Sequence, residues 1–193
     1  MNRIRYAFLG FALLQLSACA GLAYNLFETT EFQVQGEQLM MNGIINSKTP
    51  GQLAAILESN KSLQEIVLLD VPGSVDDEAN LEAARMVRAA GLNTRLLSSS
   101  EIASGGTDFF LAGAERHIAN GARLGVHSWA DGAKEGKDFP RSDPSHQLYL
   151  DYYREMGIPS SFYWFTLESA PADDIHWMSA SELAQYNMAT GSR

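Results

Sequence analysis

The stretch Glu101–Trp129, EIASGGTDFFLAGAERHIANGARLGVHSW, holds two motifs that decide how the chain folds. A turn at Ser104-Gly105-Gly106 opens an apolar helical run, and the short apolar strand Leu124-Gly125-Val126 ends at His127. A serine hydrolase brings together a serine nucleophile and a histidine base of this kind. Each residue also has a simpler explanation, because serine is a favoured helix cap and a histidine can serve as a structural hydrogen-bonding group.

Strands and helices alternate along the rest of the chain. Strands are predicted over residues 38–47, 65–70 and 93–97, and helices are predicted from Thr49 and after the turn Pro72-Gly73-Ser74-Val75. Short links between such elements predict a single α/β domain with a largely parallel sheet flanked by helices. Active sites in these sheets lie at the carboxyl ends of strands, where Gly73 and Ser104 both fall.

The C-terminal third is predicted to contain a loop and three helices. Residues 129–145 are polar and rich in turn formers, which indicates a mobile cover or a partner surface. Aromatic-rich helices are expected over residues 146–156 and 160–169. Ser179 and Glu182 form a capping-box pattern at the start of a final short helix.

The N-terminus has the features of a targeting segment. Arg3 and Arg5 precede an apolar run at Tyr6–Leu16 that is too short to span a bilayer. Leu16-Ser17-Ala18-Cys19 resembles the lipobox of bacterial lipoproteins, in which the cysteine is acylated after cleavage. The expected division is a signal peptide over 1–18, a tether over 19–37 and a folded domain over 38–193. The alternative is an ordinary secretory signal that releases a soluble periplasmic protein.

Composition narrows the partners and the compartment. The chain has 193 residues and a formal charge of −9, which disfavours nucleic acid as a partner. Loss of residues 1–18 removes two arginines and no acids, so the mature charge is 12 − 23 = −11. An acidic body held on a membrane through acylated Cys19 fits a periplasm-facing protein of the bacterial cell envelope. Cys19 is the only cysteine, so no disulfide forms within the chain.

The span from residue 66 to residue 127 resembles the Clp protease proteolytic subunit (ClpP) and its crotonase-fold relatives. The matching motifs are Pro72-Gly73-Ser74-Val75, Ser104 followed by Phe110-Leu111-Ala112-Gly113, and Ala122-Arg123-Leu124-Gly125-Val126-His127. The final helix also matches the closing helix of the family, so the resemblance covers about residues 41–187. It implies a ClpP/crotonase-like single domain built from repeated β-β-α units.

The resemblance also implies roles for individual residues. Ser104 becomes the nucleophile, His127 the general base, and the amides of Gly73 and Gly105 the oxyanion-hole donors. The aspartate of the family's triad aligns at Ile175, so the neighbouring Asp174, or else Asp173, is expected to orient His127.

Two departures from the family pattern concern this site. Ser74 replaces the second glycine of the Pro-Gly turn, which narrows the oxyanion site or moves its donor to Ser74. Asp108 lies one helical turn after Ser104, where apolar residues are more usual.

The resemblance implies a serine hydrolase, expected to be a peptidase. Its proteolysis is expected to be ATP-independent, or fed by a partner, because the sequence contains nothing that resembles an ATP-binding segment. No cofactor is expected, and the four histidines lack metal-ligand spacing, so no metal site is expected either. The family commonly assembles into rings, which points to a homo-oligomer, but the alternative is that the aromatic helices are buried within the subunit, so the oligomeric state stays open. The first alternative is a non-catalytic scaffold or binding module. The second alternative is crotonase-type acyl-thioester chemistry.

Overall fold

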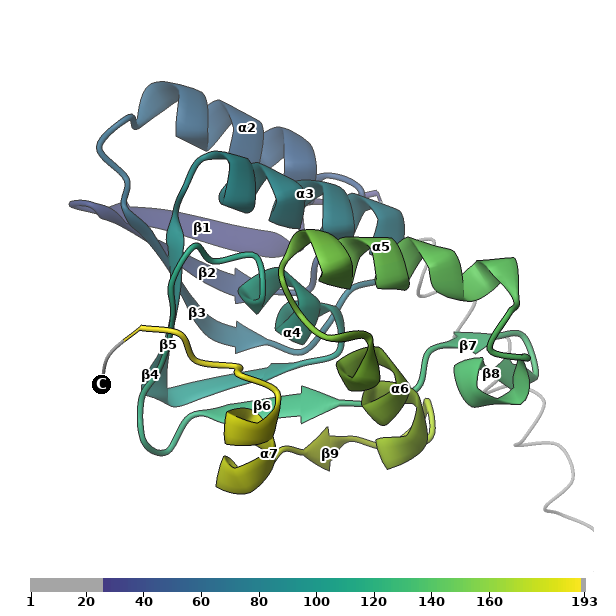
Figure 1. Ribbon diagram of the computed structural model, residues 1–193. Helices are drawn as coiled ribbons and strands as arrows, with labels where there is room; N and C mark the ends of the chain where they lie inside the picture. Colours follow the sequence, from purple (N-terminus) through teal and green to yellow (C-terminus); the bar gives the residue numbers. More distant parts are fainter. Residues whose placement is uncertain (1–25, 192–193) are drawn as a thin grey trace, which may run out of the picture.

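The computed structural model describes residues 26–191, in which a seven-stranded sheet forms the centre (Figure 1). The strand order is β1-β2-β3-β4-β6-β9, and β5 pairs with β4. Only β1 and β9 run antiparallel to their neighbours, so the predicted α/β domain with a mostly parallel sheet is confirmed. The strands are β1 (Thr30–Gln35), β2 (Gln38–Gly43), β3 (Glu65–Val71), β4 (Asn93–Ala103), β5 (Arg116–Ile118), β6 (Arg123–Val126) and β9 (His176–Trp177).

Helices flank this sheet, and α2, α3 and α5 form a row along one side of it (Figure 1). Helix α3 begins where the side chain of Asp76 accepts a hydrogen bond from the amide of Ala79, as an N-cap does. Its buried face, which includes Leu81 and Val87, packs into the hydrophobic core. The helices are α2 (Thr49–Ser59), α3 (Asp77–Ala89), α4 (Gly105–Phe110), α5 (Gln147–Glu155), α6 (Ser160–Ser169) and α7 (Ala180–Gln185).

The predicted tether over residues 19–37 is wrong for its last part, because Thr30–Gln35 forms strand β1. This strand pairs with β2 along its whole length, from Thr30 opposite Gly43 to Gln35 opposite Gln38. Its sequence, TEFQVQ, is mostly polar because one edge and one face of β1 border solvent. The folded domain therefore begins before residue 38. The proposed signal peptide and Cys19 lie outside the described residues.

The predicted polar loop at residues 129–145 has structure of its own. It contains a hairpin of β7 (Ala130–Asp131) and β8 (Lys134–Glu135), followed by short 3-10 turns. The ring of Trp129 stacks on that of Tyr149 in α5, with centroids 6.5 Å apart, and this contact packs the start of the segment against the helices. Within residues 26–191, no helix is long and apolar enough to cross a membrane.

Candidate active site

Ser104 lies between β4 and α4 in a backbone conformation that residues with a side chain rarely adopt. Its φ is 53° and its ψ is −128°, and such a position costs about 1–3 kcal/mol. The amide of Ser104 donates to the carbonyl of Gly125 at 3.1 Å, and its own carbonyl accepts from the amide of Thr107 at 2.8 Å. The hydroxyl makes no capping hydrogen bond to α4. Helix capping therefore does not explain the serine.

Glycines let the backbone approach Ser104 closely. A Cβ added to Gly73, where φ is 151°, would lie 3.2 Å from the Cβ of Ser104. A Cβ added to Gly105 would lie 2.3 Å from the Oγ of Ser74, and one added to Gly106 would lie 2.3 Å from the carbonyl oxygen of Val71. Both substitutions would need displacement of neighbouring atoms. The start of α4 is thus packed directly against the end of β3 and the turn that follows it.

The expected oxyanion donors flank the serine. Gly73 adjoins the side chain of Ser104, and Gly105 follows Ser104 in sequence. Among the described residues, no backbone acceptor takes up the amide of either glycine. Ser74, the residue that replaces the second glycine of the family pattern, donates its hydroxyl to Oδ1 of Asp77 at 2.5 Å. Its side chain is therefore directed to α3.

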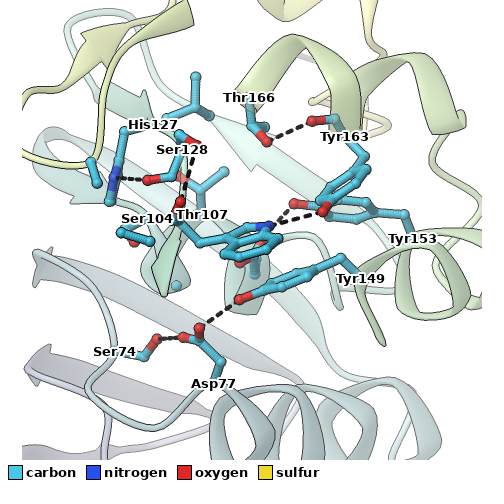
Figure 2. A pocket seen from close by; sticks show the side chains of 16 residues that line it. Ser74, Asp77, Ser104, Thr107, His127, Ser128, Tyr149, Tyr153, Tyr163 and Thr166 are labelled. Atoms are coloured by element: carbon cyan, nitrogen blue, oxygen red, sulfur yellow. Dashed lines mark hydrogen bonds between the residues drawn. The ribbon is translucent and has the colours of Figure 1, made fainter. Parts of the chain in front are cut away.

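His127 follows β6 and lines the same cavity as Ser104. Its Nδ1 lies 2.8 Å from the carbonyl oxygen of Ser128. A carbonyl can only accept, so Nδ1 carries the proton and Nε2 has the free lone pair that a general base needs. No hydrogen bond joins His127 to Ser104 in this structure, although Figure 2 shows both on the same side of the cavity. Such bonds are often loose before substrate binds.

The structure does not bring Asp174 or Asp173 to His127. Both aspartates are exposed and neither lines the cavity. Oδ1 of Asp174 accepts from the amide of the next residue, Ile175, at 2.8 Å. The group beside Nδ1 of the imidazole is therefore the Ser128 carbonyl, and neither of the two expected aspartates.

The cavity has a volume of about 270 Å³, and aromatic side chains that the sequence did not identify form one wall of it. Tyr149 and Tyr153 come from α5 and Tyr163 comes from α6 (Figure 2). Trp129 joins this wall by donating its indole N–H to the Tyr163 hydroxyl at 2.9 Å. The aromatic composition of both helices is visible in the sequence, but it does not distinguish rings that line a cavity from rings that fill the core.

Two carboxyl groups also line the cavity. Oδ1 and Oδ2 of Asp77 accept hydrogen bonds from Ser74 and from the Tyr149 hydroxyl, each at 2.5 Å. Oδ1 of Asp108 accepts from the Tyr153 hydroxyl at 2.5 Å. Burial raises the pKa of Asp108 to about 7, against the opposing effect of the Tyr153 hydrogen bond and with a contribution from the charge of Asp77.

The tyrosines remain protonated donors. Burial, followed by the charge of Asp77, holds the pKa of Tyr149 well above its usual value, and burial raises the pKa of Tyr163 to about 12. No group of three or more histidine, cysteine, aspartate or glutamate residues within residues 26–191 is arranged to hold a metal ion. The groups that this cavity offers for chemistry include Ser104, His127, the carboxyls of Asp77 and Asp108, and tyrosine hydroxyls.

No protein-family model and no curated protein matches the chain. Solved structures do match. The 1510-N membrane-bound stomatin-specific protease superposes with a TM-score of 0.53 and 14% identity over 78% of this chain and 75% of that protein. Its complex with a substrate peptide gives a TM-score of 0.52 and 15% identity over 78% and 71% of the two chains. An enoyl-CoA hydratase from Polaromonas sp. JS666 gives 0.51 and 12% identity over 84% and 69%. The chain therefore has the fold that Clp-protease-like peptidases share with crotonases.

Proposed function

We propose that this protein is a serine hydrolase of the peptidase type, with Ser104 as nucleophile and His127 as general base. The conformation of Ser104 is the observation that carries the proposal. Its backbone is strained, its hydroxyl caps no helix, and it opens to a cavity that His127 also lines. Backbone strain of this kind is concentrated at functional sites, because elsewhere it lowers stability and contributes nothing to function.

The geometry supports a specific division of labour. Ser104 Oγ attacks the substrate carbonyl as Nε2 of His127 takes its proton, and the Ser128 carbonyl keeps Nδ1 protonated and the ring oriented. The amides of Gly73 and Gly105 stabilise the oxyanion. The imidazolium then protonates the leaving amine, and water hydrolyses the acyl-enzyme with His127 again as base. Asp174 has no part in this scheme.

The proposed setting is the bacterial cell envelope. The N-terminal sequence supports cleavage after Ala18 and acylation of Cys19, which would attach the acidic domain to a membrane. A stable anchor of this type needs two or more acyl chains, since one chain binds a membrane only weakly. Peptide hydrolysis would then be independent of ATP, in keeping with the absence from the sequence of any segment that resembles an ATP-binding site.

A non-catalytic peptide-binding module is the second candidate. Two observations favour it: Ser104 and His127 share no hydrogen bond, and no carboxylate within residues 26–191 is hydrogen-bonded to the imidazole. This candidate predicts a folded domain that binds peptides without reacting with serine-directed reagents.

A fluorophosphonate probe distinguishes the two. The protein from residue 20 to residue 193 should be labelled, and both Ser104→Ala and His127→Ala should abolish labelling while they retain the wild-type thermal unfolding profile. Ser99→Ala is the matched control, because Ser99 is exposed on the same strand, β4, and should leave labelling unchanged. A folded wild-type protein that stays unlabelled would favour the binding module.

A further inference from the structure

The cavity beside Ser104 has acidic groups and no basic side chain to balance them. None of the 16 residues that line it is lysine or arginine, whereas Asp77 and Asp108 both contribute carboxyl groups. His127 is the only lining residue that can become cationic, and it is assigned to proton transfer. A ligand group of positive charge would therefore meet complementary charge at Asp77 and Asp108 and no opposing lysine or arginine among the lining residues.

The two carboxyl groups differ in how many of their oxygens already accept a hydrogen bond. Asp77 has both oxygens occupied by hydroxyl donors from Ser74 and Tyr149. Asp108 has one donor, the Tyr153 hydroxyl on Oδ1. Asp108 lines the cavity, and none of the described residues donates a hydrogen bond to its Oδ2.

The arginines of the neighbouring helix and strand are already engaged elsewhere. Arg85 pairs with Glu155, Arg88 donates to the carbonyl of Ala112, and Arg116 donates to the carbonyl of Met188. Asp108 is therefore half-buried with no cation beside it among the described residues, which is an unfavourable state for a carboxylate. The raised pKa of Asp108 records the same imbalance. A cation supplied by the substrate would correct it.

The wall beside Asp108 suits the aliphatic part of a long basic side chain. The ring of Tyr149 stacks on those of Trp129 and Tyr163, with centroids 6.5 and 5.7 Å apart. Lysine and arginine pack their methylene stems along apolar surfaces and present the charged end to an acceptor. The stacked rings offer such a surface.

The position of Asp108 relates this wall to the reacting bond. Asp108 lies four residues after Ser104, and its amide donates to the Ser104 carbonyl at 3.2 Å. The side chains of both residues line the same cavity. A substrate side chain adjacent to the carbonyl under attack would therefore extend from Ser104 towards Asp108.

We propose that the peptide substrate places a basic side chain, lysine or arginine, in this cavity at the position immediately before the scissile bond, and that Asp108 is the specificity-determining residue. The inference rests on the proposed function, because it identifies the substrate class of the same site. Charge-assisted hydrogen bonds of this kind change selectivity by about 10- to 100-fold.

Peptide diphenyl phosphonates that differ only at this side chain test the proposal in the wild-type protein at pH 8. Lysine and arginine probes should phosphonylate Ser104 at least about tenfold faster than the norleucine probe, which has a similar stem and no charge. Asp108→Asn should bring the lysine-to-norleucine ratio close to one. Asp151→Asn is the matched control, because Asp151 is an acid of α5 outside the cavity and its removal should preserve the ratio.

The outcomes separate this inference from the proposed function. Labelling by fluorophosphonate together with a norleucine probe that reacts as fast as the lysine probe would overturn the inference and leave the hydrolase intact. If no phosphonate reacts, calorimetric titration of Ser104→Ala with the methylamides of Nα-acetyl-lysine and Nα-acetyl-norleucine tests whether the cavity prefers a basic side chain. Preference for the lysine compound that Asp108→Asn removes would support a basic-residue site without catalysis, and equal binding would overturn it.

Discussion

Replacement of Ser104 by glycine should stabilise the fold even as it removes the proposed nucleophile. Ser104 holds φ at 53° and ψ at −128°, a region that glycine enters without steric cost. Relief of the strain contributes about 1–3 kcal/mol, and the greater freedom of glycine in the unfolded chain subtracts about 0.4–1 kcal/mol. The expected net gain in the free energy of unfolding is about 1 kcal/mol, or a rise in Tm of about 2–4 °C for a domain of this size.

Urea unfolding followed by tryptophan fluorescence measures this gain. Ser104→Ala is the first control: it removes the hydroxyl but keeps the Cβ and the strain, so its stability should match the wild type within about 0.5 kcal/mol. Asn187→Gly is the second control, because Asn187 also has a positive φ of 52°. Asparagine tolerates that conformation better than serine does, so Asn187→Gly should raise the free energy of unfolding less than Ser104→Gly does. A Ser104→Gly protein no more stable than Ser104→Ala would refute the claim that the active-site backbone is strained.

Three further changes test the surroundings of the serine. Gly73→Ala should destabilise the protein by about 1–3 kcal/mol and reduce fluorophosphonate labelling, because its Cβ would meet the Ser104 Cβ at 3.2 Å from a positive-φ position; unchanged labelling would argue against the amide of Gly73 as a donor. Asp174→Asn should leave the rate of labelling and its pH profile unchanged, since Asp174 is exposed and makes no hydrogen bond to His127. A labelling rate at least about tenfold lower would indicate that Asp174 acts with His127 after all. Asp108 has a pKa of about 7 in the folded state, above its unfolded value, so its contribution to stability is present at low pH and falls by at most about 1.4 kcal/mol per pH unit as the pH rises towards 7. Contact of the cavity with solvent reduces that slope. Asp108→Asn should flatten the curve, and a constant difference from wild type between pH 5 and pH 8 would contradict the assignment.

The sequence was informative where one residue type satisfies a strict local requirement. The sequence places Ser104 at the start of a predicted helix and His127 at the end of a predicted strand, and in the structure both line one cavity. Parallel strands and their following turns deliver such residues to one edge of a sheet. The resemblance to the family assigns a role to Gly73 through its Pro-Gly turn, and the close approach of Gly73 to Ser104 explains why glycine suits this position.

The sequence failed where tertiary register decides which side chain faces the site. The position of Asp174 before the closing helix predicts a role beside His127, but β9 pairs with β6 and Asp174 is exposed to solvent. The sequence of strand β1 resembles that of a tether because an edge strand can be mostly polar. The aromatic wall of the cavity was not predicted, because Tyr149 and Tyr163 could equally have filled a core.

Mapping of the fluorophosphonate adduct by mass spectrometry tests the central claim most directly. Wild-type protein treated with the probe and digested should carry one adduct, on the peptide that contains Ser104, and no adduct should form after denaturation before treatment. A folded, monodisperse protein with no adduct, or with an adduct on another serine that persists in Ser104→Ala, would contradict the proposal that this site is a serine hydrolase.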